Sequence, residues 1–338
     1  MIADYYYYST LSEKNQKLYK AIYDGIVRHD NGIPAPQNLY SQKDIQTVFD
    51  AVVEDNPHLF YFDQRQMSMG QSLFGCDVYL NYYFDIDTCR LYAQKVNEYV
   101  NAIINQSGAA NMSSEYDKVK AIYDLLISKG SYDHNDNHND ARDLAFNHTV
   151  LGLLLEKKAV CEGIARTFKL ILNAIDIKCI VVSGFASRGK KNQEAHSWNI
   201  VKIDNNSYHF DLTWGIEDSD GKSINYDYFG LNDEQIKKDH WDFSGVPSCT
   251  SKEANYFDRN GLVARKPTEL DSILKKNCKG NPVNIRVRLD YNCNVGRTAK
   301  YAQKKVMEFM QNDFCQVLVS LGMREEQQII HINAEMAV

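Results

Sequence analysis

The pattern that most restricts the fold lies between residues 160 and 213. Apolar residues recur at helical spacing from Val160 to Ile175. Three strand-like runs follow, at 178–184, 195–203 and 207–213. Asp204-Asn205-Asn206 between the last two runs is typical of a hairpin turn. The sequence therefore predicts an α+β fold in which a helix packs on a mainly antiparallel sheet.

Three residues of this segment have the chemistry of a thiol site. Cys161 falls in the first turn of the predicted helix, where the helix dipole favours an anion. Alternation along the last two runs puts His196 on one face of its strand and Asp211 on one face of the neighbouring strand, within reach of each other. We interpret Cys161 as a nucleophile, His196 as its base and Asp211 as the group that orients the imidazole.

These residues lie in three ordered blocks, KAVCEGIA at 158–165, HSWNIV at 196–201 and YHFDLTW at 208–214. The blocks resemble the core of the bacterial transglutaminase-like superfamily, which has a papain-like thiol fold. The resemblance extends from about Tyr116, through Tyr132-Asp133, to residues 228–231 and His240. It implies a Cys-His-Asp triad, no cofactor, and thiol acyl chemistry that ranges from peptide hydrolysis to amide cross-linking. Deglycosylating amidases and inactive relatives share the fold, so substrate is not implied.

The chain departs from the family pattern next to the nucleophile. Ala159 stands where glycine is common, and Glu162 replaces the tryptophan of the cross-linking eukaryotic enzymes. Leu155 occupies the place of the oxyanion glutamine of papain-type proteases. The backbone N–H of Cys161 can supply one oxyanion donor, and Tyr132 is our candidate for another.

Each of these residues also has a purely structural interpretation. A lone cysteine on an amphipathic helix is usually a core residue, and only its combination with His196 and Asp211 favours catalysis. We interpret Trp198 and Trp214 as cleft walls that pack rather than react. His209 shares a face with Asp211 and could replace the base, although a partly exposed strand histidine is the favoured interpretation.

The loop from Asp133 to Asp140 invites a metal interpretation. It starts like a calcium loop, but His138 stands at the sixth position, where glycine is required, and Leu144 at the twelfth, where glutamate belongs. His134 and His138 lack the further ligands of a zinc site. We predict a solvated loop, no metal and no cofactor.

Composition limits the size and the partners of the protein. A chain of 338 residues with 44% hydrophobic content is long enough for two or three units. We divide it into an N-terminal mainly helical region with aromatic strands (1–110), a transglutaminase-like core (111–262) and a small α+β domain (263–338). The net charge of -6, without a long basic run, gives no support for nucleic-acid or anionic-membrane partners.

The sequence has no signal-like start and no apolar stretch of membrane-spanning length. We expect a cytoplasmic protein if Met1 is the native start, and an extracellular or cell-surface protein if a leader was removed. The eight scattered cysteines have no C-x-x-C pair, and we interpret most of them as buried free thiols.

The combined hypothesis is a cysteine-dependent amide or peptide hydrolase, or an acyltransferase, that acts on a protein or peptide through a thioester. The alternative is a non-catalytic binding module that keeps the fold as a scaffold.

Overall fold

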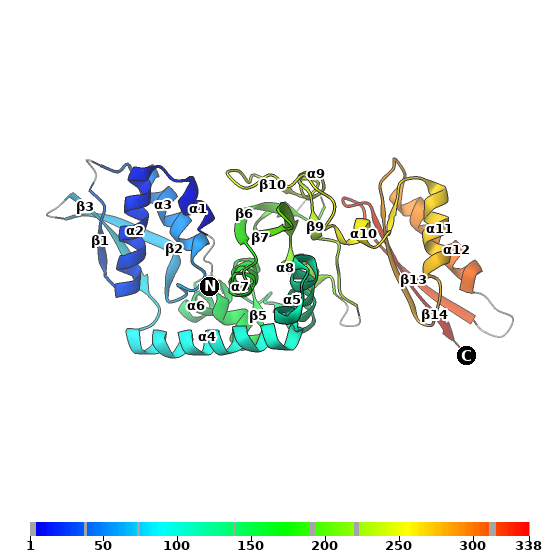
Figure 1. Cartoon of the computed structure of the whole chain (residues 1–338), viewed down its shortest axis with the longest axis horizontal. Helices are drawn as coiled ribbons and strands as arrows, with labels where there is room; N and C mark the ends of the chain where they lie inside the picture. The colour runs from blue at the N-terminus through cyan, green and yellow to red at the C-terminus, as the bar shows by residue number, and fades with distance from the viewer. Residues whose placement is uncertain are drawn as a thin grey trace.

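The structure is a computed structural model that describes residues 5–36, 39–72, 75–137, 139–189, 193–219, 223–310 and 316–337. Three bodies lie in a row along the longest axis of the molecule (Figure 1), and each has its own cluster of buried apolar side chains. The chain folds as α+β, as predicted, because amphipathic helices and mostly antiparallel strands bury their apolar faces against each other.

The first body combines three helices with a three-stranded sheet of order β1-β3-β2. Ser12 and Ser41 cap the two longer helices by accepting a hydrogen bond from a backbone N–H of the first turn. The elements are α1 (Tyr6–Thr10), α2 (Glu13–Arg28), β1 (Gly32–Pro34), α3 (Gln42–Asp55), β2 (Phe62–Ser72) and β3 (Gly75–Tyr82).

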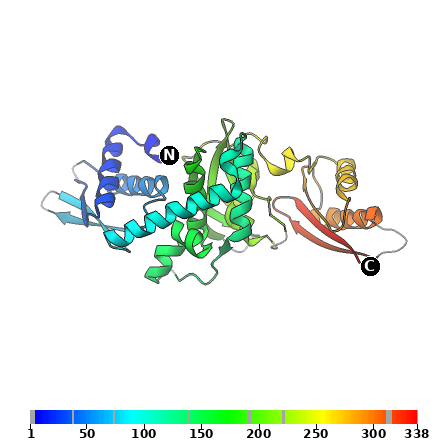
Figure 2. The ribbon, with the colours of Figure 1, turned by 60° about the horizontal axis from the view of Figure 1, so that its bottom comes forward.

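A long helix, α4 (Ile86–Ser107), connects the first body to the second. It begins at the cap Asp85 and ends at Gly108, whose φ of 71° suits glycine. Figures 1 and 2 show α4 running beside both bodies. Its buried residues Val96, Val100 and Ile104 belong to the cluster of the central body, although our boundary at 110 groups α4 with the N-terminal region.

The central body holds a five-stranded sheet of order β10-β6-β7-β8-β9, in which every neighbouring pair is antiparallel. Its elements are a 3₁₀ turn (Ala109–Asn111), α5 (Glu115–Lys129), β4 (Ser131–Tyr132), α6 (Ala141–Asn147), a π-helical turn (Gly152–Glu156), β5 (Lys158–Ala159), α7 (Cys161–Ala174), β6 (Cys179–Ser187), β7 (Gln193–Ile203), β8 (Asn206–Phe210), α8 (Leu212–Glu217), β9 (Phe229–Leu231), α9 (Asp233–Ile236), β10 (His240–Trp241) and α10 (Tyr256–Arg259).

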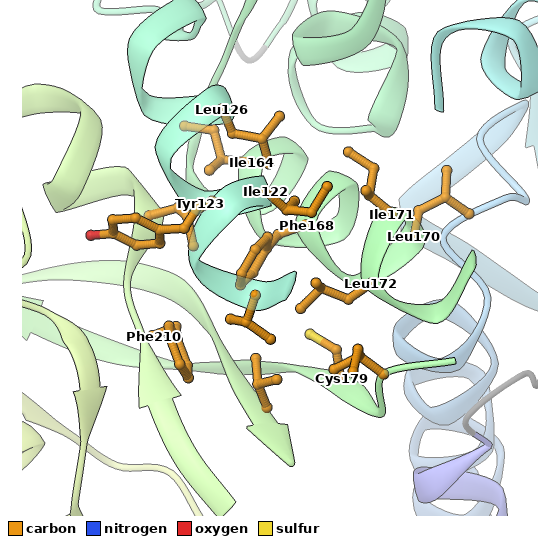
Figure 3. Close-up of a cluster of buried hydrophobic side chains, with 14 of the residues drawn as sticks. Ile122, Tyr123, Leu126, Ile164, Phe168, Leu170, Ile171, Leu172, Cys179 and Phe210 are labelled. Atoms are coloured by element: carbon orange, nitrogen blue, oxygen red, sulfur yellow. The ribbon is translucent and has the colours of Figure 1, made fainter. Parts of the chain in front are cut away.

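Helix α7 packs on this sheet and is itself covered by α5. Figure 3 shows Ile122 of α5 and Phe168 of α7 in the buried cluster, with Phe210 of β8 contributed by the sheet. The hairpin between β7 and β8 turns at Asp204 and Asn205, which have φ values of 49° and 69°. Aspartate and asparagine tolerate this left-handed region, so the predicted turn is confirmed.

One strand boundary differs from our prediction. We expected the last run to continue to Thr213, but β8 ends at Phe210 and Asp211 caps a new helix, α8. The Asp211 side chain accepts a hydrogen bond from the backbone N–H of Trp214 at 3.1 Å. An aspartate in this position competes well with strand continuation because it satisfies a free N–H of the helix start.

The third body is an α+β layer with strand order β11-β12-β14-β13. Its elements are β11 (Val263–Ala264), α11 (Pro267–Asn277), β12 (Val283–Leu289), α12 (Val295–Met310), β13 (Gln316–Arg324) and β14 (Ile329–Ala337). Among the helices of the described ranges, none is long and apolar enough to cross a membrane.

Six cysteines have described side chains, and all six are free thiols. Cys89, Cys179 and Cys249 are buried, whereas Cys161, Cys278 and Cys293 are partly exposed. The side chain of Cys76 and all of Cys315 lie outside the described residues.

Candidate active site

Cys161 is the first residue of α7, where the helix presents unpaired backbone N–H groups. The preceding strand β5 fixes its position, because Ala159 pairs with Tyr132 of β4 and the N–H of Val160 donates to the carbonyl of Asn147 at 3.1 Å. Gly163 permits this approach, since a Cβ there would lie 2.3 Å from the Asn147 carbonyl oxygen. The partly exposed thiol is thus held at a positive helix end.

His196 and Asp211 meet at the edge between β7 and the start of α8. His196 Nε2 lies 2.9 Å from Asp211 Oδ2, and the two side chains are 3% and 0% exposed. Since Nε2 is engaged by the carboxylate, Nδ1 is the ring nitrogen left for Cys161. We predicted this contact from the alternation of side chains on two neighbouring strands. Asp211 instead caps α8, so strand alternation alone does not position its side chain.

The buried pair strongly favours its charged form. Burial alone would lower the pKa of His196, but the Asp211 carboxylate and a hydrogen bond with Cys161 raise it to about 10. Burial alone would raise the pKa of Asp211, but His196 and His240 hold it below its ordinary value. An imidazolium beside a thiol stabilises the thiolate, which is the nucleophilic form.

Tyr132 lies on β4, opposite the strand residue that leads into Cys161. Burial, and then the charge of Cys161, raise the pKa of the Tyr132 hydroxyl, which therefore stays protonated and can donate a hydrogen bond. This is what an oxyanion donor requires.

The two tryptophans lie behind the imidazoles. Trp198 and Trp214 are each 1% exposed, with ring centroids 6.2 Å and 5.4 Å from that of His196. Aromatic rings this close exclude water from the back of His196. In this structure they form a packed wall rather than a solvent-facing surface of a cleft.

His209 differs from the partly exposed strand histidine that we favoured. It is completely buried, its Nδ1 accepts from Trp198 Nε1 at 3.1 Å, and its Nε2 lies 3.0 Å from Asp233. Burial lowers its pKa despite the Asp233 carboxylate. The structure gives His209 partners on both ring nitrogens, and neither of them is Cys161.

Two groups near the site were missed at the sequence level. His240 on β10 places Nε2 3.3 Å from Asp211 Oδ2, and His148 places Nδ1 2.6 Å from Glu162, the residue after Cys161. Burial would raise the pKa of Glu162, but Arg166 and His148 hold it at about 2. His240 lies within the segment that carries the family resemblance, whereas His148 has no sequence signal that we can name.

The possible metal ligands are already hydrogen bonded. His196, Asp211 and His240 offer ligand atoms within 4.8 Å of one another, but both imidazoles contact the same Asp211 oxygen. Most described residues of the loop at 133–140 are exposed, as predicted, namely His134, Asn135, Asn137, Asn139 and Asp140. Asp133 is the exception, since it is 6% exposed and contacts Asn147. His138 lies outside the described residues.

Comparison with known proteins identifies the central body. Residues 103–212 match the family model of the transglutaminase-like superfamily. The matched segment is a transglutaminase-like domain. The segment that matches contains Cys161, His196 and Asp211, and the papain-like α+β fold of this transglutaminase-like domain agrees with the arrangement of α7 on its sheet. The search of curated proteins found no match.

Solved structures resemble parts of the chain. A transglutaminase crystal structure aligns with a TM-score of 0.32 and 20% identity over 46% of this chain. A candidate cysteine protease from Cytophaga hutchinsonii aligns with a TM-score of 0.29 and 19% identity over 35% of this chain. A candidate protease from Parabacteroides distasonis aligns with a TM-score of 0.27 and 10% identity over 81% of this chain. The aligned parts are 45%, 37% and 57% of those chains, so the activities of the whole proteins are not transferred to this one.

Proposed function

We propose that this transglutaminase-like protein is a cysteine-dependent amide or peptide hydrolase that works through a thioester. The observation that carries the proposal is the buried His196–Asp211 contact of 2.9 Å beside a partly exposed cysteine at the first residue of a helix. Nucleophilic cysteines need a base, an orienting group and a positive environment, and the three residues supply them.

Each group has one task in the proposed reaction. The Cys161 thiolate attacks the carbonyl carbon of an amide, and the backbone N–H of Cys161 with the Tyr132 hydroxyl stabilises the developing oxyanion. His196 gives its proton to the leaving amine, which departs as the thioester forms. It then takes a proton from water, whose oxygen attacks the thioester, and the thiolate returns as the acid is released. Asp211 keeps the imidazole in the required orientation throughout.

The acyl acceptor separates hydrolysis from cross-linking. Water reaches any site that admits a substrate, whereas cross-linking requires a second site that holds an amine. We therefore favour hydrolysis of a protein or peptide. Transfer to an amine stays the runner-up, and both reactions use the same thioester.

Thiol labelling tests the proposal without a known substrate. Limited iodoacetamide at mildly acidic pH should alkylate Cys161 before the other cysteines, as read by peptide mass mapping. Cys293 is the matched control because its thiol is also partly exposed. Burial raises the pKa of Cys89 to about 11, so that thiol should react slowly.

A labelled protein substrate then tests the reaction. Fluorescent casein should be cleaved by the wild type and left intact by Cys161→Ala, while incorporation of a fluorescent primary amine would instead reveal acyl transfer. Equal labelling of Cys161 and Cys293 at acidic pH would favour the scaffold alternative over the enzyme.

A further inference from the structure

The C-terminal body reaches into the central body through the tip of the β13–β14 hairpin. The tip points toward the central body in Figure 1, where the two strands are red. Gln327 lies in this turn and is nevertheless completely buried. Its side-chain amide nitrogen lies 2.8 Å from Asp239 Oδ2 and 3.0 Å from the carbonyl oxygen of Gln235. Both partners accept, so the orientation of the amide is determined.

Asp239 receives hydrogen bonds from three sides. Tyr228 Oη donates to Oδ2 at 2.7 Å, Gln327 donates to the same oxygen, and His240 Nδ1 lies 2.7 Å from Oδ1. With 4% of its surface exposed, this residue depends on those donors rather than on water. These contacts hold both oxygens of the Asp239 side chain in place.

His240 lies between two carboxylates. Its Nδ1 contacts Asp239 and its Nε2 contacts Asp211 Oδ2 at 3.3 Å, the same oxygen that binds His196. Both ring nitrogens of His240 therefore lie within hydrogen-bonding distance of a carboxylate oxygen. The side chains of His240, Asp211 and Asp239 are 0%, 0% and 2% exposed, so solvent screens these contacts little.

A second contact fastens the same hairpin near the triad. Arg324, the last residue of β13, forms ion pairs with Asp218 and Asp227, and its guanidinium lies 6.0 Å from the centre of the Trp214 ring. Asp218 follows α8, the helix that Asp211 caps. The C-terminal body therefore contacts the residue that follows α8 through Arg324 and the residue that precedes His240 through Gln327.

We infer that His240 and Gln327 are positioning residues for Asp211, so that the C-terminal body sets the geometry of the triad through the chain Gln327–Asp239–His240–Asp211. The inference rests on the proposed function, because it concerns the orientation of the His196–Asp211 pair. It assigns the C-terminal body a part in catalysis without any residue of that body touching the substrate.

Two substitutions of His240 separate positioning from packing. The amide nitrogen of His240→Gln reaches the place of Nε2 and keeps a donor for Asp211. The amide nitrogen of His240→Asn takes the place of Nδ1. This variant therefore keeps the contact with Asp239 and loses the contact with Asp211. We expect His240→Asn to slow the alkylation of Cys161 at pH 6 by about tenfold and to shift its pH profile upward, since a hydrogen bond to a charged group is lost. His240→Gln should restore most of the rate.

Gln327→Met tests the link from the C-terminal body in the full-length chain, with the exposed neighbour Glu326→Gln as control. We expect Gln327→Met to slow alkylation by about two- to fivefold, because a hydrogen bond two contacts away from Asp211 is lost. Glu326→Gln should leave the rate unchanged. Thermal unfolding of each variant shows whether the fold persists.

The outcomes distinguish this inference from the proposed function. A wild type whose Cys161 is not selectively alkylated contradicts the proposed function itself. A selective wild type with equal rates and pH profiles in His240→Asn and His240→Gln overturns the positioning of Asp211 by His240. Wild-type labelling in Gln327→Met, measured on folded protein, overturns the part of the C-terminal body.

Discussion

Replacing Asp211 by asparagine is the sharpest test of the buried pair. Asp211→Asn keeps the volume of the side chain and the oxygen that caps Trp214 at 3.1 Å. It replaces Oδ2 by an NH₂ group, which donates where His196 needs an acceptor. His196 then accepts at Nε2 and carries its proton on Nδ1, the nitrogen that must take the proton of Cys161. The variant therefore holds the imidazole in the wrong tautomer.

The size of the effect follows from the electrostatics of the pair. The pKa of His196 is raised from 6.5 to about 10 although burial opposes the change. At about 1.4 kcal/mol for each pH unit, that gap corresponds to about 5 kcal/mol in favour of the imidazolium. Costs of about 3–5 kcal/mol for breaking a buried pair are of the same size. Of this free energy, about 1.5–3 kcal/mol corresponds to one charge-assisted hydrogen bond between His196 and the Cys161 thiolate.

The assay is the pH dependence of Cys161 alkylation. We expect Asp211→Asn to react about 10- to 100-fold more slowly than wild type at pH 6, because burial without a carboxylate leaves His196 neutral. Cys293, far along the sequence in the C-terminal body, should be labelled at the same rate in both proteins. Its rate therefore controls for general unfolding.

Wild-type labelling of the folded variant would refute this role of Asp211. If folded Asp211→Asn labels Cys161 at the wild-type rate across pH 5 to 8, the carboxylate does not sustain the imidazolium. A loss of labelling at Cys161 and a gain at the buried Cys249 would instead mean that the protein had unfolded.

Further predictions concern stability and turnover. The raised pKa of His196 adds stability below pH 6.5 that fades as pH rises toward 10, and the lowered pKa of Asp211 adds stability above about pH 3.8 that fades in acid. In urea titrations, the free energy of unfolding of the wild type should therefore exceed that of Asp211→Asn by the largest amount between about pH 4 and 6.5. A difference that is larger at pH 9 would contradict this assignment. Cys161→Ala should lose more turnover than Asp211→Ala, since the second keeps nucleophile and base; the reverse order on any substrate would exclude the thiol route. Gly163→Ala should cost about 1–3 kcal/mol, because its Cβ would lie 2.3 Å from the Asn147 carbonyl oxygen, and an unchanged denaturation midpoint would show that α7 shifts freely.

The sequence alone determined the local elements of the central body. Helix α7 and strands β6 and β7 follow from the period of their apolar residues, and the turn at Asp204 and Asn205 follows from residues that tolerate positive φ. The helix start at Cys161 is a local feature as well. Interactions between residues close in sequence produce these elements, so one amino-acid sequence is enough to predict them.

Longer-range contacts were decided by the tertiary structure. Asp211 satisfies both a strand pattern and a helix cap, and only the packing of α8 selects the cap. The sequence alone predicts a partly exposed strand position for His209, whereas in the fold Trp198 and Asp233 contact both of its ring nitrogens. His240 contacts Asp211 across 29 residues of sequence, and Gln327 contacts Asp239 across 88 residues. No local period records such contacts, because side chains that distant in sequence become neighbours only when separate bodies pack together.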